Sequence, residues 1–125
     1  MTPKRVFVSY DFDSDEFLKD SIISQAKNPD SPFEVSDVSL REEAPQAEWE
    51  TRTRAAIARA DIFLVMLGSK TRQAPGVRKE VRMANAFAKM RLQIIGYDNG
   101  SEDWAVPNAG PVYKWSWPNL KDLLK

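Results

Sequence analysis

The 125-residue sequence predicts an α/β fold, with helices on both faces of a parallel β-sheet. Three observations support this class. Residues 61–67 are apolar after the first position and do not alternate, which is typical of a strand buried on both faces. A helical pattern follows, with Val77, Val81, Ala84 and Ala88 on one stripe. Strand and helix patterns also alternate along the whole chain, as in parallel sheets joined by right-handed helical crossovers.

Two strands and two helices are predicted before this central strand. Residues 5–10 are β-branched and aromatic, which favours a first strand, and residues 33–38 alternate apolar with polar side chains, as in an edge strand. Asp13 and Glu16 have the spacing of a capping box for the first helix, which Pro29 ends. The inward residues of this helix are Phe17, Leu18, Ile22, Ile23 and Ala26.

The second helix is predicted after a polar loop at residues 39–43, with Pro45 in its first turn. Its sides differ in polarity, so one face should pack on the sheet and the other should face water. The inward residues are Trp49, Thr53, Ala56, Ile57 and Ala60, and the arginines of the solvent side are Arg52, Arg54 and Arg59.

The last third of the chain predicts two more strands and a helix. Residues 92–97 form the fourth strand, residues 98–101 a turn and residues 102–111 an ordered loop. A short fifth strand at residues 112–115 precedes a terminal helix, whose inward residues are Leu120, Leu123 and Leu124. We therefore expect one domain over residues 1–125, with five parallel strands in the flavodoxin-like order 2-1-3-4-5.

This strand order predicts where a ligand would bind. The loops after the first and third strands flank one crevice at the carboxyl edge of the sheet, where open α/β folds bind their ligands. Residues 74–76 (Ala-Pro-Gly) indicate a loop after the third strand, and Glu80 lies near the start of the next helix. We expect Tyr10, Asp11, Ser69 and Glu80 to converge there.

Composition excludes several functional classes. Eighteen basic residues balance eighteen acidic ones, so net charge gives no support to binding of nucleic acid or of an anionic membrane. The chain contains no cysteine and no histidine, which removes disulfides, thiolate nucleophiles, the usual zinc sites and histidine-dependent triads. The N-terminus has no apolar region of a signal peptide, and we expect a cytoplasmic protein.

Glu80 is the strongest candidate for chemistry. A carboxylate at the rim of an apolar crevice can stabilise a developing cation or activate a sugar hydroxyl, as in glycosyl transfer. A structural interpretation competes with this one, because acidic residues are favoured in the first turns of helices.

Other charged groups have a functional and an ordinary interpretation. The acidic cluster Asp11, Asp13, Asp15 and Glu16 has oxygen ligands suited to Mg²⁺, but helix capping explains most of it, and we predict no metal site. A receiver-type phosphoacceptor would need an aspartate after the third strand, where the chain has Leu67 and Gly68. The basic third helix and its flanks can grip phosphates or a partner, or simply be solvated; these residues are Arg72, Arg78, Lys79, Arg82, Lys89 and Arg91.

Four segments carry a resemblance to a known family. Residues 4–10 (KRVFVSY), 68–71 (GSKT), 77–81 (VRKEV) and 114–120 (KWSWPNL) resemble, in this order, the TIR-like family that includes the ThsB component of Thoeris anti-phage defence. The resemblance implies a flavodoxin-like TIR domain whose active relatives cleave the nicotinamide bond of NAD⁺ and can cyclise the ADP-ribose product into a signal for an effector.

The resemblance also implies roles for individual residues. The catalytic glutamate of the family corresponds to Glu80, and its nucleotide pocket to Ser9, Tyr10 and Asp11, with Ser69 opposite. Related sequences carry an aromatic residue just before the Val-Arg pair, where this chain has Gly76. This difference affects stacking on the substrate or contact with a neighbouring subunit.

These observations lead to three hypotheses. The first is a TIR-like NAD⁺ glycohydrolase or cyclase in anti-phage signalling, with Glu80 as the catalytic carboxylate, NAD⁺ as substrate, no cofactor, self-association through TIR-like surfaces and an effector that senses the product. The second is a non-catalytic TIR-like adaptor that assembles through its charged helices. The third is a receiver-like or nucleotide-sensing module.

Overall fold

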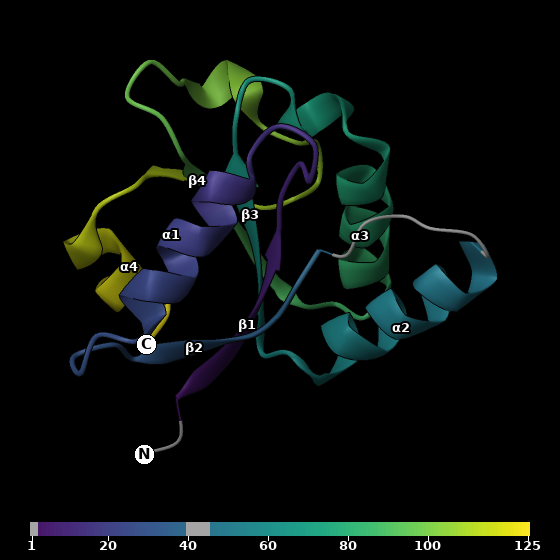
Figure 1. The fold of residues 1–125 in the computed structure, drawn as a ribbon, viewed down its shortest axis with the longest axis horizontal. Helices are drawn as coiled ribbons and strands as arrows, with labels where there is room; N and C mark the ends of the chain where they lie inside the picture. The colour runs from purple at the N-terminus through teal and green to yellow at the C-terminus, as the bar shows by residue number, and fades with distance from the viewer. Residues whose placement is uncertain (1–2, 40–45) are drawn as a thin grey trace.

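The computed structural model describes residues 3–39 and 46–125 and contains a five-stranded sheet in the order β2-β1-β3-β4-β5. Neighbouring strands are parallel at all four pairings. The predicted strand order and α/β class are therefore confirmed (Figure 1).

The elements follow each other in the predicted alternation. The strands are β1 Lys4–Ser9, β2 Phe33–Val38, β3 Ile62–Leu67, β4 Met90–Ile95 and β5 Val112–Lys114. The α-helices are α1 Glu16–Ala26, α2 Gln46–Arg59, α3 Pro75–Ala86 and α4 Trp117–Leu123, and the short 3₁₀ helices are η1 Thr71–Gln73 and η2 Glu102–Trp104.

Helices cover both faces of the sheet. Helices α1 and α4 lie on one side and α2 and α3 on the other (Figure 1). All six residues of β3 are buried, and they alternate between two apolar clusters, with Phe63, Val65 and Leu67 facing the α2–α3 side. Strand β3 is thus central, as its unbroken apolar run predicts.

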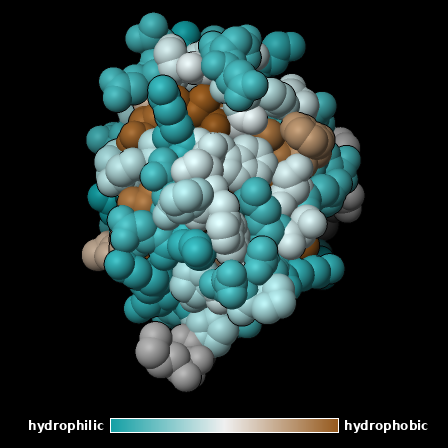
Figure 2. All heavy atoms as spheres, turned by 90° about the vertical axis from the view of Figure 1, so that its left-hand side faces the viewer, coloured by the Kyte–Doolittle hydropathy of each residue, from teal (hydrophilic) through white to brown (hydrophobic). Residues whose placement is uncertain are grey.

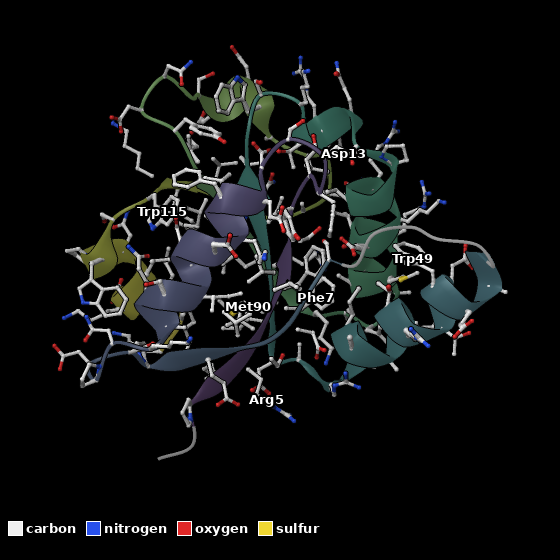
Figure 3. The ribbon with its side chains drawn as sticks, viewed as in Figure 1. Arg5, Phe7, Asp13, Trp49, Met90 and Trp115 are labelled. Carbon is white, nitrogen blue, oxygen red and sulfur yellow. The ribbon has the colours of Figure 1, made fainter. Side chains whose placement is uncertain are left out.

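The inward residues of α2 are also confirmed. Its predicted inward residues, from Trp49 to Ala60, are 0 to 6% exposed, and its three arginines point to solvent. Figure 3 shows Trp49 on the flank of α2 that faces α3, and Phe7 between the sheet and α2. The predicted position of Pro45 and the loop around Leu40 lie outside the described residues.

Three local predictions about the helices are wrong. The N-cap of α1 is Asp15, whose side chain makes no capping hydrogen bond, so Asp13 and Glu16 do not form a capping box. Phe17, expected to point inward, is 63% exposed. Ala88 lies beyond the end of α3 with a φ of 53°, because the chain leaves the helix there to enter β4.

The boundaries of two other elements also differ from prediction. Residues 75 and 76 belong to α3 rather than to the preceding loop, since proline is well suited to the first helical position. Strand β4 begins and ends two residues earlier than predicted, which leaves Gly96 and Tyr97 in the loop after it. The terminal helix is confirmed, with Ser116 as its N-cap accepting a hydrogen bond from the Asn119 N–H.

The predicted ordered loop at residues 102–111 is held by one buried side chain. Gln93, on β4, is 1% exposed. Its amide nitrogen donates to the carbonyl oxygens of Val106 (3.1 Å) and Gly110 (2.8 Å), and its oxygen accepts from the Val106 N–H (2.8 Å). The Gln93 side chain therefore satisfies backbone groups of this loop, which is not itself part of a strand.

The surface shows small, separate apolar areas. On the face with α1 and α4, hydrophilic and near-neutral residues dominate, and hydrophobic atoms appear as isolated spots (Figure 2). In the described part of the chain, no helix has the length and hydropathy needed to cross a membrane.

Candidate active site

Glu80 is completely buried where β1, β2 and α3 meet. Two hydroxyl groups donate to the same carboxylate oxygen, Oε1: Ser9 Oγ at 2.7 Å and Ser39 Oγ at 2.6 Å. These distances are typical of O–H···O⁻ hydrogen bonds, which are stronger than those between neutral groups. The two serines therefore stabilise the charge of the carboxylate and fix the position of Oε1.

The local sequence explains why Glu80 points inward. It lies three residues after Val77 and four before Ala84, on the stripe of α3 that packs on the sheet. Because α3 begins at the carboxyl edge of the sheet, Glu80 lies next to the ends of β1 and β2.

Ser39 is held in place by its own backbone and side chain. Its N–H donates to the carbonyl oxygen of Val8 (2.9 Å), and its Oγ accepts from the N–H of Tyr10 (3.1 Å). The hydroxyl that Ser39 offers to Glu80 is thus preorganised.

A cavity of about 250 Å³ adjoins this carboxylate. Its walls come from the loop after β1, from Ser39 and from the start of α3; the lining residues are Tyr10, Asp11, Phe12, Asp13, Ser39, Ala74, Pro75, Gly76, Val77 and Glu80. Figure 3 shows Asp13 at this edge of the sheet, near the start of α3. The volume lies near the lower end of the roughly 300–1,000 Å³ usual for small-molecule sites, so the cavity suits a nucleoside-sized group.

The described lining is acidic. It contains three carboxyl side chains, those of Asp11, Asp13 and Glu80, and no lysine or arginine. Burial raises the pKa of the Tyr10 phenol, while Lys19 acts in the opposite direction. Within the residues that the structure describes, no three carboxylates gather closely enough to hold a metal ion. The electrostatics of this cavity favour a cationic group.

The structure brings together most of the residues singled out from sequence. Ser9, Tyr10, Asp11 and Glu80 meet at the end of β1, but Ser9 contacts the glutamate instead of lining the cavity. Ser69 is exposed and is absent from the cavity lining, so it does not converge with the others as expected. The segment after β3 lines the cavity through residues 74–77 instead.

Sequence reasoning missed Ser39. It follows an alternating edge strand and precedes a polar loop, so its residue type gave no signal. The parallel pairing of β1 with β2 sets Val8 opposite Val38. Only this register indicates that the residues after them, Ser9 and Ser39, lie close together.

A second buried carboxylate, Asp15, lies beside this site and is 4% exposed. It accepts hydrogen bonds from Tyr97 Oη (2.9 Å) and Thr71 Oγ1 (3.4 Å). A Cβ atom on Gly68 would clash with the Asp15 carboxylate, so a larger residue there would displace this side chain. Asp15 thereby links the loops after β1, β3 and β4.

The surroundings of Asp15 affect its protonation. Burial raises the pKa of the Asp15 carboxyl; the Tyr97 hydrogen bond opposes this, and the charge of Asp11 adds to it. Burial likewise raises the pKa of Tyr97 to about 12, and the bond to Asp15 adds to that shift. Asp15 is therefore the N-cap residue of α1 by position, while its side chain links loops instead of capping the helix.

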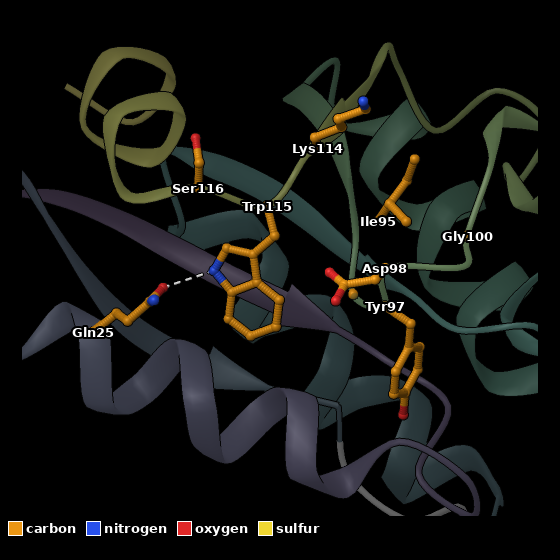
Figure 4. Close-up of a pocket in the computed structure, with 9 residues that line it drawn as sticks. Gln25, Ile95, Tyr97, Asp98, Gly100, Lys114, Trp115 and Ser116 are labelled. Carbon is orange, nitrogen blue, oxygen red and sulfur yellow. Dashed lines mark hydrogen bonds between the residues drawn. The ribbon is translucent and has the colours of Figure 1, made fainter.

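A larger cavity of about 480 Å³ lies beyond β4 and β5. In Figure 4 the Trp115 indole forms part of its wall and donates through Nε1 to Gln25 Oε1 at 2.8 Å. Lys114 and Asp98 are at its border. Tyr97 lines this larger cavity. Its hydroxyl also donates to Asp15, in the loop after β1 that forms part of the acidic cavity beside Glu80.

Comparison with known proteins identifies the family. The model of the family "Thoeris protein ThsB, TIR-like domain" matches residues 7–102, from β1 to the start of η2. The chain belongs to this family. The matched region includes Ser9, Ser39 and Glu80, and it confirms the resemblance drawn from the four sequence segments. No curated protein matches the TIR-like chain.

A solved structure shares the fold. The CMP N-glycosidase BcmB of Clostridium botulinum superposes with a TM-score of 0.56 at 18% sequence identity, over 97% of this chain and 95% of the other. At this identity the similarity shows the fold alone. The TIR-like chain and the nucleotide glycosidase thus share one α/β architecture.

Proposed function

We propose that this TIR-like domain is a nucleotide N-glycosidase that cleaves NAD⁺, with Glu80 as the catalytic carboxylate. The observation that carries the proposal is the Glu80 carboxylate, fixed by two serine hydroxyls against a nucleoside-sized cavity at the carboxyl edge of the sheet. Membership of the ThsB family and the fold shared with a CMP N-glycosidase support the same reaction class.

The proposed reaction breaks the bond between C1′ of the ribose and the nicotinamide nitrogen. The bonding electron pair moves to that nitrogen, which releases neutral nicotinamide and leaves an oxocarbenium-like ribosyl cation. Glu80 stabilises this cation and orients the ribose hydroxyls. Water, or a nucleophile within the ADP-ribose product, then bonds to C1′ and loses a proton, which gives a hydrolysed or a cyclised product.

Cavity charge favours NAD⁺ over a nucleoside monophosphate. The nicotinamide riboside end of NAD⁺ is a cation, and Asp11, Asp13 and Glu80 surround the space with carboxyl groups. A 5′-phosphate placed in the same space would be repelled, because the described lining offers no basic side chain. The cavity is also too small for a whole dinucleotide, so the ADP portion would extend outside it.

Glu80 has no solvent-exposed surface in this conformation. Side chains of the lining must therefore move before a ribose can contact the carboxylate. Phe12 is only partly buried and stacks on Tyr10 with ring centroids 5.8 Å apart, so the Phe12 ring can move while Tyr10 keeps its place in the core.

The test compares the wild-type protein with Glu80→Gln, which keeps the size of the side chain. Each protein, at several concentrations and with and without lysate from phage-infected cells, is incubated with NAD⁺, nicotinamide riboside or CMP, and free base is measured by chromatography. We expect nicotinamide release by wild type, a loss of about 10²-fold or more in Glu80→Gln, and little cytosine from CMP. Glu102→Gln, an exposed change of the same type, serves as control.

Equal nicotinamide release by wild type and Glu80→Gln would contradict the catalytic role. One observation favours a second candidate, a non-catalytic interaction module: the complete burial of Glu80 also suits a structural tie between β1, β2 and α3. That candidate predicts concentration-dependent assembly without base release, and a lower melting temperature for Glu80→Gln. Under either candidate, an anti-phage signalling role follows from the family and remains part of the proposal.

A further inference from the structure

A basic groove lies on the flank of α3 that faces away from Glu80. Its volume is about 190 Å³, and α3 together with the 106–108 segment of the ordered loop lines it. The polar side chains of the lining are Arg78, Arg82, Asn85 and Asn108. Among the residues that the structure describes, it shares none with the acidic cavity, and none of its lining residues is a carboxylate.

The two arginines are notable for their lack of partners. Arg78 and Arg82 are one helical turn apart, so their like charges repel each other. Among the described residues, neither guanidinium makes a hydrogen bond or ion pair, whereas Arg52 and Arg59, on α2, each bind a carboxylate. An anion between the two guanidinium groups would relieve the repulsion and use their donors.

The opposite wall of the groove is rigid. Gln93 holds Val106 through hydrogen bonds to both its N–H and its carbonyl oxygen, and Val106 is buried. Asn108 follows with a φ of 65°, a left-handed conformation that asparagine tolerates. The amide of Asn108 is thereby presented from a fixed loop across from Arg78 and Arg82.

We propose that this groove binds a phosphoryl anion, either inorganic pyrophosphate or the phosphate end of a small nucleotide. Two guanidinium groups offer paired donors that match phosphate oxygens, and the two asparagines add neutral donors. The described lining of the groove has no aromatic ring on which a base could stack. This inference does not depend on the chemistry of Glu80.

The test uses sodium pyrophosphate as probe and ¹⁵N NMR at constant ionic strength, with sodium chloride as the ionic-strength control. We expect chemical-shift changes confined to α3 and residues 106–108, and about tenfold or greater weakening in the double variant Arg78→Gln/Arg82→Gln. Arg78→Lys/Arg82→Lys keeps the charge but loses the paired donors, so its affinity should be intermediate. Adenosine diphosphate should shift the same α3 residues with similar affinity.

Two further variants separate this site from general charge effects. Lys27→Gln/Arg54→Gln removes two exposed positive charges elsewhere and should bind pyrophosphate like wild type. Glu80→Gln should also bind it like wild type, whatever its effect on NAD⁺ cleavage. The proposal is overturned if pyrophosphate shifts residues outside the groove, if chloride gives the same shifts, or if both double glutamine variants weaken binding equally.

Discussion

At the scale of single residues, Ser9 and Ser39 define the position of the Glu80 carboxylate. Replacement of either serine by alanine removes one hydroxyl donor to Oε1. A hydrogen bond to a charged group contributes about 1.5–3 kcal/mol, so we expect each change to lower kcat for nicotinamide release by about 10- to 100-fold. Because the two donors share one acceptor, the double variant should lose less than the product of the single losses.

The control for the serine variants is Ser36→Ala. Ser36 lies on β2 and donates to the Val6 carbonyl oxygen at 3.3 Å, away from the cavity. We expect unchanged kcat for this variant. A loss in Ser36→Ala equal to that in Ser39→Ala would show that β2 as a whole, and not the hydroxyl on Glu80, determines the rate.

Asp15 predicts a pH dependence of stability. Its folded-state pKa is raised above the ordinary value of 3.8, first of all by burial. The neutral carboxyl is thus favoured by folding, and the associated stability is fully present below pH 3.8 and is lost as pH rises through the raised value. We expect the free energy of unfolding of wild type to fall, relative to Asp15→Asn, between pH 3.5 and 7.

Urea unfolding of both proteins at pH 3.5, 5 and 7 measures this difference. Asp98→Asn, which changes an exposed aspartate in the same loop as Tyr97, gives the contribution of a surface carboxyl group. A difference between wild type and Asp15→Asn that stays constant, or that grows in favour of wild type with rising pH, would contradict the role of burial.

The candidate site was only partly predictable from sequence for a physical reason. Glu80 was identifiable because its place in the predicted fold, at the start of a helix after the central strand, is a ligand-binding position. Ser39 and Asp15 were not, since their roles come from contacts with Glu80, Thr71 and Tyr97 that are distant in sequence. From sequence alone, a short polar residue near a strand end that faces solvent cannot be distinguished from one that faces a buried carboxylate.

At the scale of elements, the ordered loop 102–111 depends on Gln93. Gln93→Leu would leave three backbone groups without their partner, the two of Val106 buried and the Gly110 carbonyl partly buried. An unsatisfied buried polar group costs about 1–3 kcal/mol, so we expect a loss of about 3 kcal/mol or more in the free energy of unfolding and faster hydrogen exchange in this loop.

The matched control is Gln25→Leu. The Gln25 side chain accepts one hydrogen bond, from Trp115 Nε1, and Gln25 is only partly buried. We expect it to lose about 1 kcal/mol. Equal destabilisation by the two leucine variants would mean that the loop is held by packing and not by the Gln93 amide.

Elements with a strong periodic pattern were predicted better than their ends. The alternation of residues 33–38 gave the bounds of β2, and the polarity of α2 gave its inward face. The end of β4 and the start of α1 were wrong, because Gly96, Tyr97 and Asp15 serve contacts between loops that no local pattern encodes. The role of Gln93 in holding the loop was not predicted for the same reason, since its strand otherwise has an apolar pattern.

At the scale of the whole molecule, β3 joins the two halves of the core. Its odd and even positions face opposite helical layers, with Leu64 on the α1–α4 side and Phe63 on the α2–α3 side. The central place of β3 was predictable because an unbroken apolar run is typical of a strand covered on both faces. The two layers should therefore unfold as one unit.

This cooperativity is testable with Leu64→Ala. Leu64 is completely buried, so the substitution should lower the free energy of unfolding by about 2–5 kcal/mol. Although Leu64 belongs to the apolar cluster on the α1–α4 side, we expect hydrogen exchange to speed up by similar factors in α1 and in α3, because β3 cannot be lost from one layer alone. Met90→Ala, at a residue 53% exposed on β4, should change stability by less than about 0.5 kcal/mol. Undiminished protection of α3 in Leu64→Ala would instead show that the layer carrying Glu80 is stable without the other.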